Sequence, residues 1–177
     1  MTYHGNSPGS GTSTCWGCGR TADEAAGPTP EEHSASAGCW ASNGQVLARS
    51  YTDSGYRAVH QMVLDAYAAQ QADGTSRREL QSVGLCLMTL CLFVEDGVDP
   101  AQGPALHKQI VAHRPDAAWL APPIQPGPMV VADVLSARDI DEHCRLVREG
   151  GRQVWQAWAP HHATIHAWNA QALTSPL

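Results

Sequence analysis

The sequence is 177 residues long, which is the usual size of a single domain. Hydrophobic residues make up 43% and charged residues 16%, which supplies enough apolar material for a packed core and excludes a disordered composition. Eleven Lys and Arg against seventeen Asp and Glu give a net charge of −6, and no basic stripe occurs, so we expect no nucleic-acid partner.

The N-terminal region is rich in Gly, Ser, Thr and Pro and lacks the apolar segment of a signal peptide. The most apolar run, from Val83 to Val94, is shorter than the ~18 residues that a membrane span needs. We therefore expect no membrane contact and a cytoplasmic location. In that compartment the six cysteines stay reduced, which argues against a disulfide framework.

The chain divides into three parts by composition. Residues 1–14 contain mostly small polar residues and are predicted to be a flexible tail. Residues 15–40 are predicted to be an irregular metal-binding lobe, since a segment with so few apolar residues needs a staple. Residues 41–177 show apolar residues at helical spacing, so the fold class is mainly α: a helical bundle that forms one domain with the lobe.

Capping and stop signals divide the bundle into helices. The central one, which Ser76 begins and Gly97 ends, is apolar nearly all round and is expected to be buried. Asp139 begins a long helix near the C-terminus, and Pro160 restarts it. No alternating pattern of a strand is present. The predicted helices cover residues 41–49, 53–72, 76–97, 100–114, 132–137, 139–158 and 160–170.

The lobe contains the strongest chemical signal in the chain. Cys15 and Cys18 form a Cys-x-x-Cys turn, which places two thiolates together, and Cys39 follows in a second Gly-flanked segment. Zinc prefers four tetrahedral sulfur or nitrogen ligands, so we predict a Zn2+ site whose fourth ligand is His60, with His33 as the alternative closer in sequence. A redox pair or plain buried thiols are the competing interpretations.

The remaining cysteines have a different setting. Cys86 and Cys91 lie in the apolar helix and Cys144 in the long C-terminal one. Free cysteine is among the most buried residue types, so these three are predicted to be core residues.

The histidines suggest a second group of functional residues. His162 and His166 are four residues apart, so one helical face presents both rings, as in other metal-binding helices. His60 would complete a three-histidine site with an open position, but it cannot serve both sites; otherwise His107 or a carboxylate must join. Solvated histidines are the alternative interpretation.

One further side chain is a candidate for catalysis. Tyr67, with Asp65 nearby in sequence, could transfer protons, although a packing role is the simpler interpretation. The predicted catalytic residues are therefore His162, His166 and Tyr67. In contrast, His4, His113 and His143 are expected at the surface.

Several segments together resemble a known family. The pieces CWGC, GCW, VHQMVLDAYAAQ, ALH and AWAPHHATIHAW are similar to DUF5946, a family of bacterial proteins without an assigned activity, over Cys15 to Trp168. In that family the helix that contains the VHQMVLDAYAAQ segment commonly ends in Gln-His, whereas this chain has Gln70-Gln71 at that place. The resemblance implies a fold and site positions but no reaction. The histidine pattern also resembles DinB-type bundles, which carry a three-histidine metal site.

Three functions agree with these residues. The first is a metalloenzyme acting on a small-molecule substrate, with zinc as Lewis acid or water activator. The second is a non-catalytic module that binds a protein partner and uses zinc as a structural staple. The third is a thiol redox sensor based on Cys15 and Cys18. The sequence does not determine the oligomeric state.

Overall fold

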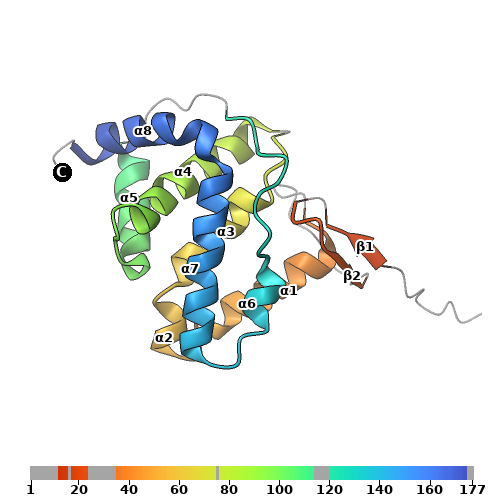
Figure 1. Cartoon of the computed structure of the whole chain (residues 1–177). Helices are drawn as coiled ribbons and strands as arrows, with labels where there is room; N and C mark the ends of the chain where they lie inside the picture. The colour runs from red at the N-terminus through yellow and green to blue at the C-terminus, as the bar shows by residue number, and fades with distance from the viewer. Residues whose placement is uncertain (1–11, 16, 24–34, 75, 114–119, 175–177) are drawn as a thin grey trace, which may run out of the picture.

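The computed structural model describes residues 12–15, 17–23, 35–74, 76–113 and 120–174. Helices make up most of these residues, which confirms the mainly α class (Figure 1). The elements are β1 (Thr12–Thr14), β2 (Thr21–Asp23), α1 (Ala37–Arg49), α2 (Ser54–Arg57), α3 (His60–Gln70), α4 (Arg77–Val94), α5 (Gly103–Ala112), α6 (Val131–Leu135), α7 (Ile140–Ala157) and α8 (His162–Thr174). Short 3-10 turns, Pro100–Gln102 and Ala159–His161, precede α5 and α8.

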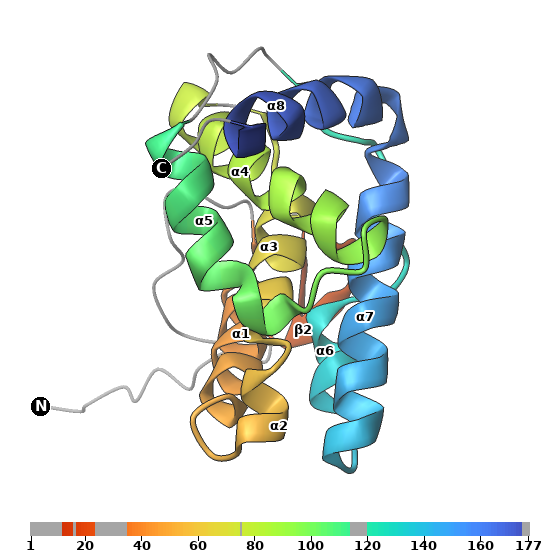
Figure 2. The same ribbon diagram turned by 90° about the vertical axis from the view of Figure 1, so that its left-hand side faces the viewer.

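Helices α3, α4 and α7 form the centre of the molecule. Each of the three packs against the other two, and α8 lies across α4 at one end of α7 (Figure 2). The opposite end is built from α1, α2 and α6, and the two-stranded ribbon lies beside α1 (Figure 1). Within the part of the chain that the structure describes, no helix combines the length and apolar character needed to cross a bilayer.

Helix α4 follows its prediction closely. Ser76 caps it, since its hydroxyl accepts the backbone N–H of Glu79 at 3.0 Å. The buried Glu79 carboxylate accepts the N–H groups of Asp73 and Gly74 at 3.1 and 3.0 Å. One side chain thus joins the end of the α3 segment to the start of α4. This turn connects α3 and α4, which pack directly against each other.

The predictions for the first half of the chain need three corrections. Thr12–Thr14, expected in the tail, pair antiparallel with Thr21–Asp23. Helix α1 begins at Ala37 rather than near residue 41, because Ser36 supplies an N-cap. The helix predicted over residues 53–72 is broken near Val59, which separates α2 from α3.

His143 was expected at the surface but is fully buried on α7. Its ring meets Tyr56 edge-on at a centroid distance of 4.8 Å, and neither ring nitrogen has a hydrogen-bond partner among the described residues. Burial lowers the pKa of His143 to about 4, because the charged ring would lose its hydration without gaining a counter-ion.

We predict that this histidine makes the fold acid-sensitive. The unfolded chain takes up the proton near pH 6.5, whereas the folded chain resists it down to about pH 4, so stability falls as pH drops through that window. Between pH 7.5 and pH 5, wild type should lose about 2 kcal/mol more unfolding free energy than His143→Phe, measured by urea denaturation. Equal losses in the two proteins would contradict the assignment.

Candidate metal centre

The turn between β1 and β2 carries the first two cysteines. The N–H of Cys15 donates to the carbonyl of Arg20 at 2.9 Å, and the N–H of Gly19 donates to the carbonyl of Cys15 at 2.8 Å. Gly19 has a φ of 69°, a conformation that glycine adopts without steric cost. The ribbon therefore holds Cys15 and Cys18 on one tight turn.

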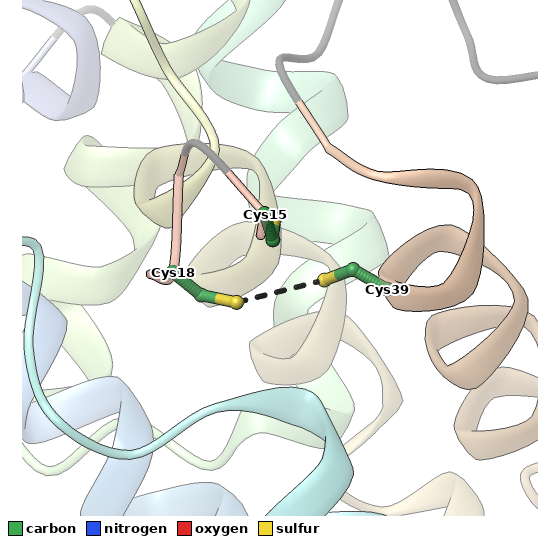
Figure 3. A group of neighbouring side chains, drawn as sticks. All are labelled: Cys15, Cys18 and Cys39. Carbon is green, nitrogen blue, oxygen red and sulfur yellow. Dashed lines mark hydrogen bonds between the residues drawn. The ribbon is translucent and has the colours of Figure 1, made fainter. Parts of the chain in front are cut away.

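The third cysteine comes from a different element. Cys39 lies in the first turn of α1, where its N–H donates to the Ser36 hydroxyl at 3.2 Å. Figure 3 shows the side chains of Cys18 and Cys39 pointing toward each other, with Cys15 beside them. The sulfurs of Cys18 and Cys39 are 3.9 Å apart, and all three sulfurs lie within 4.8 Å of one another. None of them is in a disulfide.

These distances suit a tetrahedral ion. With zinc–sulfur bonds of ~2.3 Å, two thiolates on one ion lie about 3.8 Å apart. The separation of Cys18 and Cys39 is close to this value. Cys15 and Cys39 are 1% and 7% exposed, so the cluster is shielded from water on most sides.

Gln71, directly after α3, occupies a further side of the cluster. The Cys15 thiol donates to its Oε1 at 3.2 Å, and its Nε2 donates to the sulfur of Cys39 at 3.6 Å. The Gln71 side chain is completely buried. A Cβ added to Gly17 would stand only 2.1 Å from Oε1 of Gln71, so the close approach of the ribbon to α3 requires glycine there.

Tyr67 lies one helical turn before Gln71 and is also part of this site. Its hydroxyl donates to the sulfur of Cys39 at 3.7 Å, and its ring lies 6.0 Å from that of Trp40. Burial, reinforced by the charge of a nearby Cys39 thiolate, raises the pKa of Tyr67 well above its usual range. The structure thus places this predicted residue beside the cysteines, as a neutral hydrogen-bond donor.

The three thiols influence one another's pKa values. Once Cys15 has ionised, the thiols of Cys18 and Cys39 donate to its thiolate, which lowers the pKa of Cys15. The same contacts raise the pKa values of Cys18 and Cys39, and burial adds to this. The ionisation of one thiol therefore opposes the ionisation of the other two.

His60, the predicted fourth ligand, is not brought to the cysteines. It begins α3, whereas Gln71 follows the other end of that helix, about 16 Å away along its axis. The His60 ring instead meets Tyr51 edge-on at 5.9 Å. The alternative ligand His33 lies outside the described residues. The position that faces the sulfurs is residue 71, where the family resemblance had indicated a missing histidine.

His162 and His166 belong to another group of side chains, at the contact of α8 with α4. Nε2 of His166 lies 2.6 Å from Oε2 of Glu95, and the sulfur of Cys91 lies 4.0 Å from the same oxygen. Burial opposes ionisation of Glu95, but hydrogen bonds from Trp155 and His166 outweigh it and lower the pKa. Burial and Glu95 raise the pKa of Cys91 to about 11.

Sequence reasoning identified most members of both groups but missed two of them. The alternative of a carboxylate partner for the late histidines was open, yet Glu95 was not singled out because it ends an apolar helix with no motif around it. His107, the other alternative, pairs with the buried Asp65 at 3.0 Å instead. Gln71 was missed because an amide is not a usual zinc ligand.

Comparison with known proteins gives one match. The model of DUF5946, described as a family of unknown function, matches residues 13–159. This range includes the three clustered cysteines and Gln71, and it ends before His162 and His166. No curated protein and no solved structure matches the chain.

Proposed function

The chain belongs to the DUF5946 family, and from its own side chains we propose that it is a zinc-binding protein whose ion is held by Cys15, Cys18 and Cys39. One observation carries the proposal: three sulfurs from two separate segments lie within 4.8 Å of one another, with one pair at the spacing of a zinc tetrahedron.

The donor set favours zinc over other common ions. Thiolates are soft ligands and select zinc or copper(I), whereas magnesium and calcium require oxygen. Gln71 offers one amide oxygen on the remaining side of the cluster, 3.2 Å from the sulfur of Cys15. The chain thus supplies three strong ligands and one weak one.

The ion's first role in this proposal is to fasten the ribbon to the bundle. Each strand of the ribbon is three residues long, and a lone two-stranded hairpin is marginally stable in water. Cys39 belongs to α1 and Gln71 follows α3, so an ion at the sulfurs would tie the ribbon to two helices at once. This is the staple of the non-catalytic module.

A small-molecule metalloenzyme is the second candidate, and the identity of residue 71 favours it. An amide oxygen is a weaker zinc ligand than imidazole, so water or a substrate could replace Gln71 on the ion. The hydroxyl of Tyr67 lies beside Cys39 and could donate a hydrogen bond there. A small apolar cavity of about 40 Å³ adjoins the site; Tyr67, Val63 and Val130 are among its lining residues.

Removing one cluster thiol should remove the ion. Cys18→Ser and Cys39→Ser are expected to hold one zinc fewer per chain than wild type, measured by elemental analysis after dialysis, because two sulfurs cannot retain zinc in competition with buffer. Cys144→Ser is the matched control, since its thiol donates to the carbonyl of Gly55 and lies outside the cysteine cluster. Unchanged zinc in Cys39→Ser would refute the site.

Completing the ligand set should strengthen binding. Gln71→His is expected to raise zinc affinity about tenfold or more, measured by competition with a chromophoric chelator. Wild type and Gln71→His also distinguish a structural zinc from a catalytic one. If the fourth position is exchangeable, added imidazole shifts the visible spectrum of Co2+-substituted wild type but not that of Gln71→His. Equal affinities in the two proteins would show that residue 71 does not face the ion.

The redox alternative predicts a different outcome. A disulfide requires sulfurs ~2.05 Å apart, so the sulfurs of Cys15 and Cys18, which lie within 4.8 Å of each other, would have to move together. We expect zinc to prevent this: after peroxide treatment of the zinc-loaded protein, mass spectrometry after alkylation should find all three cysteines reduced. A reversible Cys15–Cys18 disulfide formed with the zinc retained would favour a sensor and contradict the zinc proposal.

A further inference from the structure

A second set of metal-ligating side chains lies where α8 crosses α4. Cys91 and Glu95 are one turn apart on α4, and His162 and His166 are one turn apart on α8. One ligand atom from each of Cys91, Glu95 and His166 lies within 4.8 Å of the others. We propose that these three residues form a second transition-metal site, separate from the cysteine cluster, with a coordination position open to solvent.

The carboxylate of the proposed site is already oriented. Nε1 of Trp155, a buried residue of α7, donates to Oε1 of Glu95 at 2.8 Å. This bond leaves Oε2 facing His166 at 2.6 Å and Cys91 at 4.0 Å. Ligating carboxylates in metal sites usually accept a hydrogen bond of this kind, which fixes the orientation of the ligand before the ion binds.

The neighbouring His162 adds a further lone pair. Its Nε2 donates to the carbonyl of Trp155 at 2.9 Å, so in the neutral ring Nδ1 carries no proton. That Nδ1 lies 3.9 Å from Oε1 of Glu95, and the ring stacks on Trp155 at 3.8 Å. A cation held by Glu95 would therefore lie within reach of His162 as well.

The donor types indicate the class of ion. A thiolate, an imidazole and a carboxylate together suit Zn2+ or Co2+ and do not suit Mg2+ or Ca2+. The Cys91 thiol must release its proton to solvent when the ion binds, so affinity should rise with pH. Cys91 is 3% exposed, whereas the side chains of Glu95 and His166 are 37% and 49% exposed. Water or a small ligand can therefore reach the remaining position.

The competing explanation is a simple ion pair between Glu95 and His166. Such a pair at a half-exposed position contributes little stability and needs neither Cys91 nor the Trp155 hydrogen bond. The two explanations differ in what happens to the Cys91 sulfur. Only a metal site places a metal–thiolate bond there.

The test uses the full-length protein with its first zinc bound, titrated with Co2+. We expect one further equivalent to bind and to produce a thiolate-to-cobalt charge-transfer band. Cys91→Ala should lose the band, and His166→Ala should weaken binding at least about tenfold. Trp155→Phe, which removes the orienting N–H together with part of the buried indole that stacks on His162, should weaken it about tenfold. Cys144→Ser and His161→Ala are the matched controls and should bind as wild type does.

Any result other than these would contradict the proposal of a second metal site. Cobalt binding without a thiolate band, or a band that persists in Cys91→Ala, would leave only the ion pair. The outcome is distinguishable from failure of the first site, because a band that arises at the cysteine cluster disappears in Cys39→Ser and survives in Cys91→Ala.

Discussion

The mutual approach of three sulfurs is the constraint on which the N-terminal third of this protein depends. Cys15 and Cys18 come from a ribbon with two three-residue strands, and Cys39 comes from the first turn of α1. Hydrophobic burial alone contributes little to holding such a short ribbon against the bundle. Three thiols at this spacing repel one another once ionised, so a positive ion among the sulfurs would stabilise the contact that joins the two parts.

Helix periodicity and capping chemistry predicted the bundle because they are local. Ser76 and Asp139 begin α4 and α7 as their side chains require, and the apolar run of α4 is buried as expected. One failure was local: the Ser36 N-cap was overlooked, and it extends α1 backward over Cys39. The other was not local, because the N-terminal strand gains its partner only from residues on the far side of the Cys-x-x-Cys turn.

The difference between local and long-range interactions also explains which residues of the site were predicted. A Cys-x-x-Cys motif can be recognised from the sequence alone. It led to the prediction of Cys39 as the third member of the group, and the structure places the three sulfurs together. His60 was a reasonable fourth ligand by residue type, but the direction of α3 carries it to the opposite end of the helix. Tyr67 was predicted, with Asp65, as a candidate for proton transfer, and its hydroxyl contacts the sulfur of Cys39. Residue type indicates the chemistry that a side chain can perform, whereas helix direction decides which partners it meets.

The glycine at position 17 links two distant parts of the chain. A Cβ at position 17 would stand 2.1 Å from Oε1 of Gln71 and 2.9 Å from its backbone Cα. A shorter side chain at position 71 would remove only the first of these contacts, so a relative with another residue at position 17 must let the ribbon move outward and separate the sulfurs. Retention of glycine at this position across the family would therefore record how tightly its members hold the ribbon against the bundle.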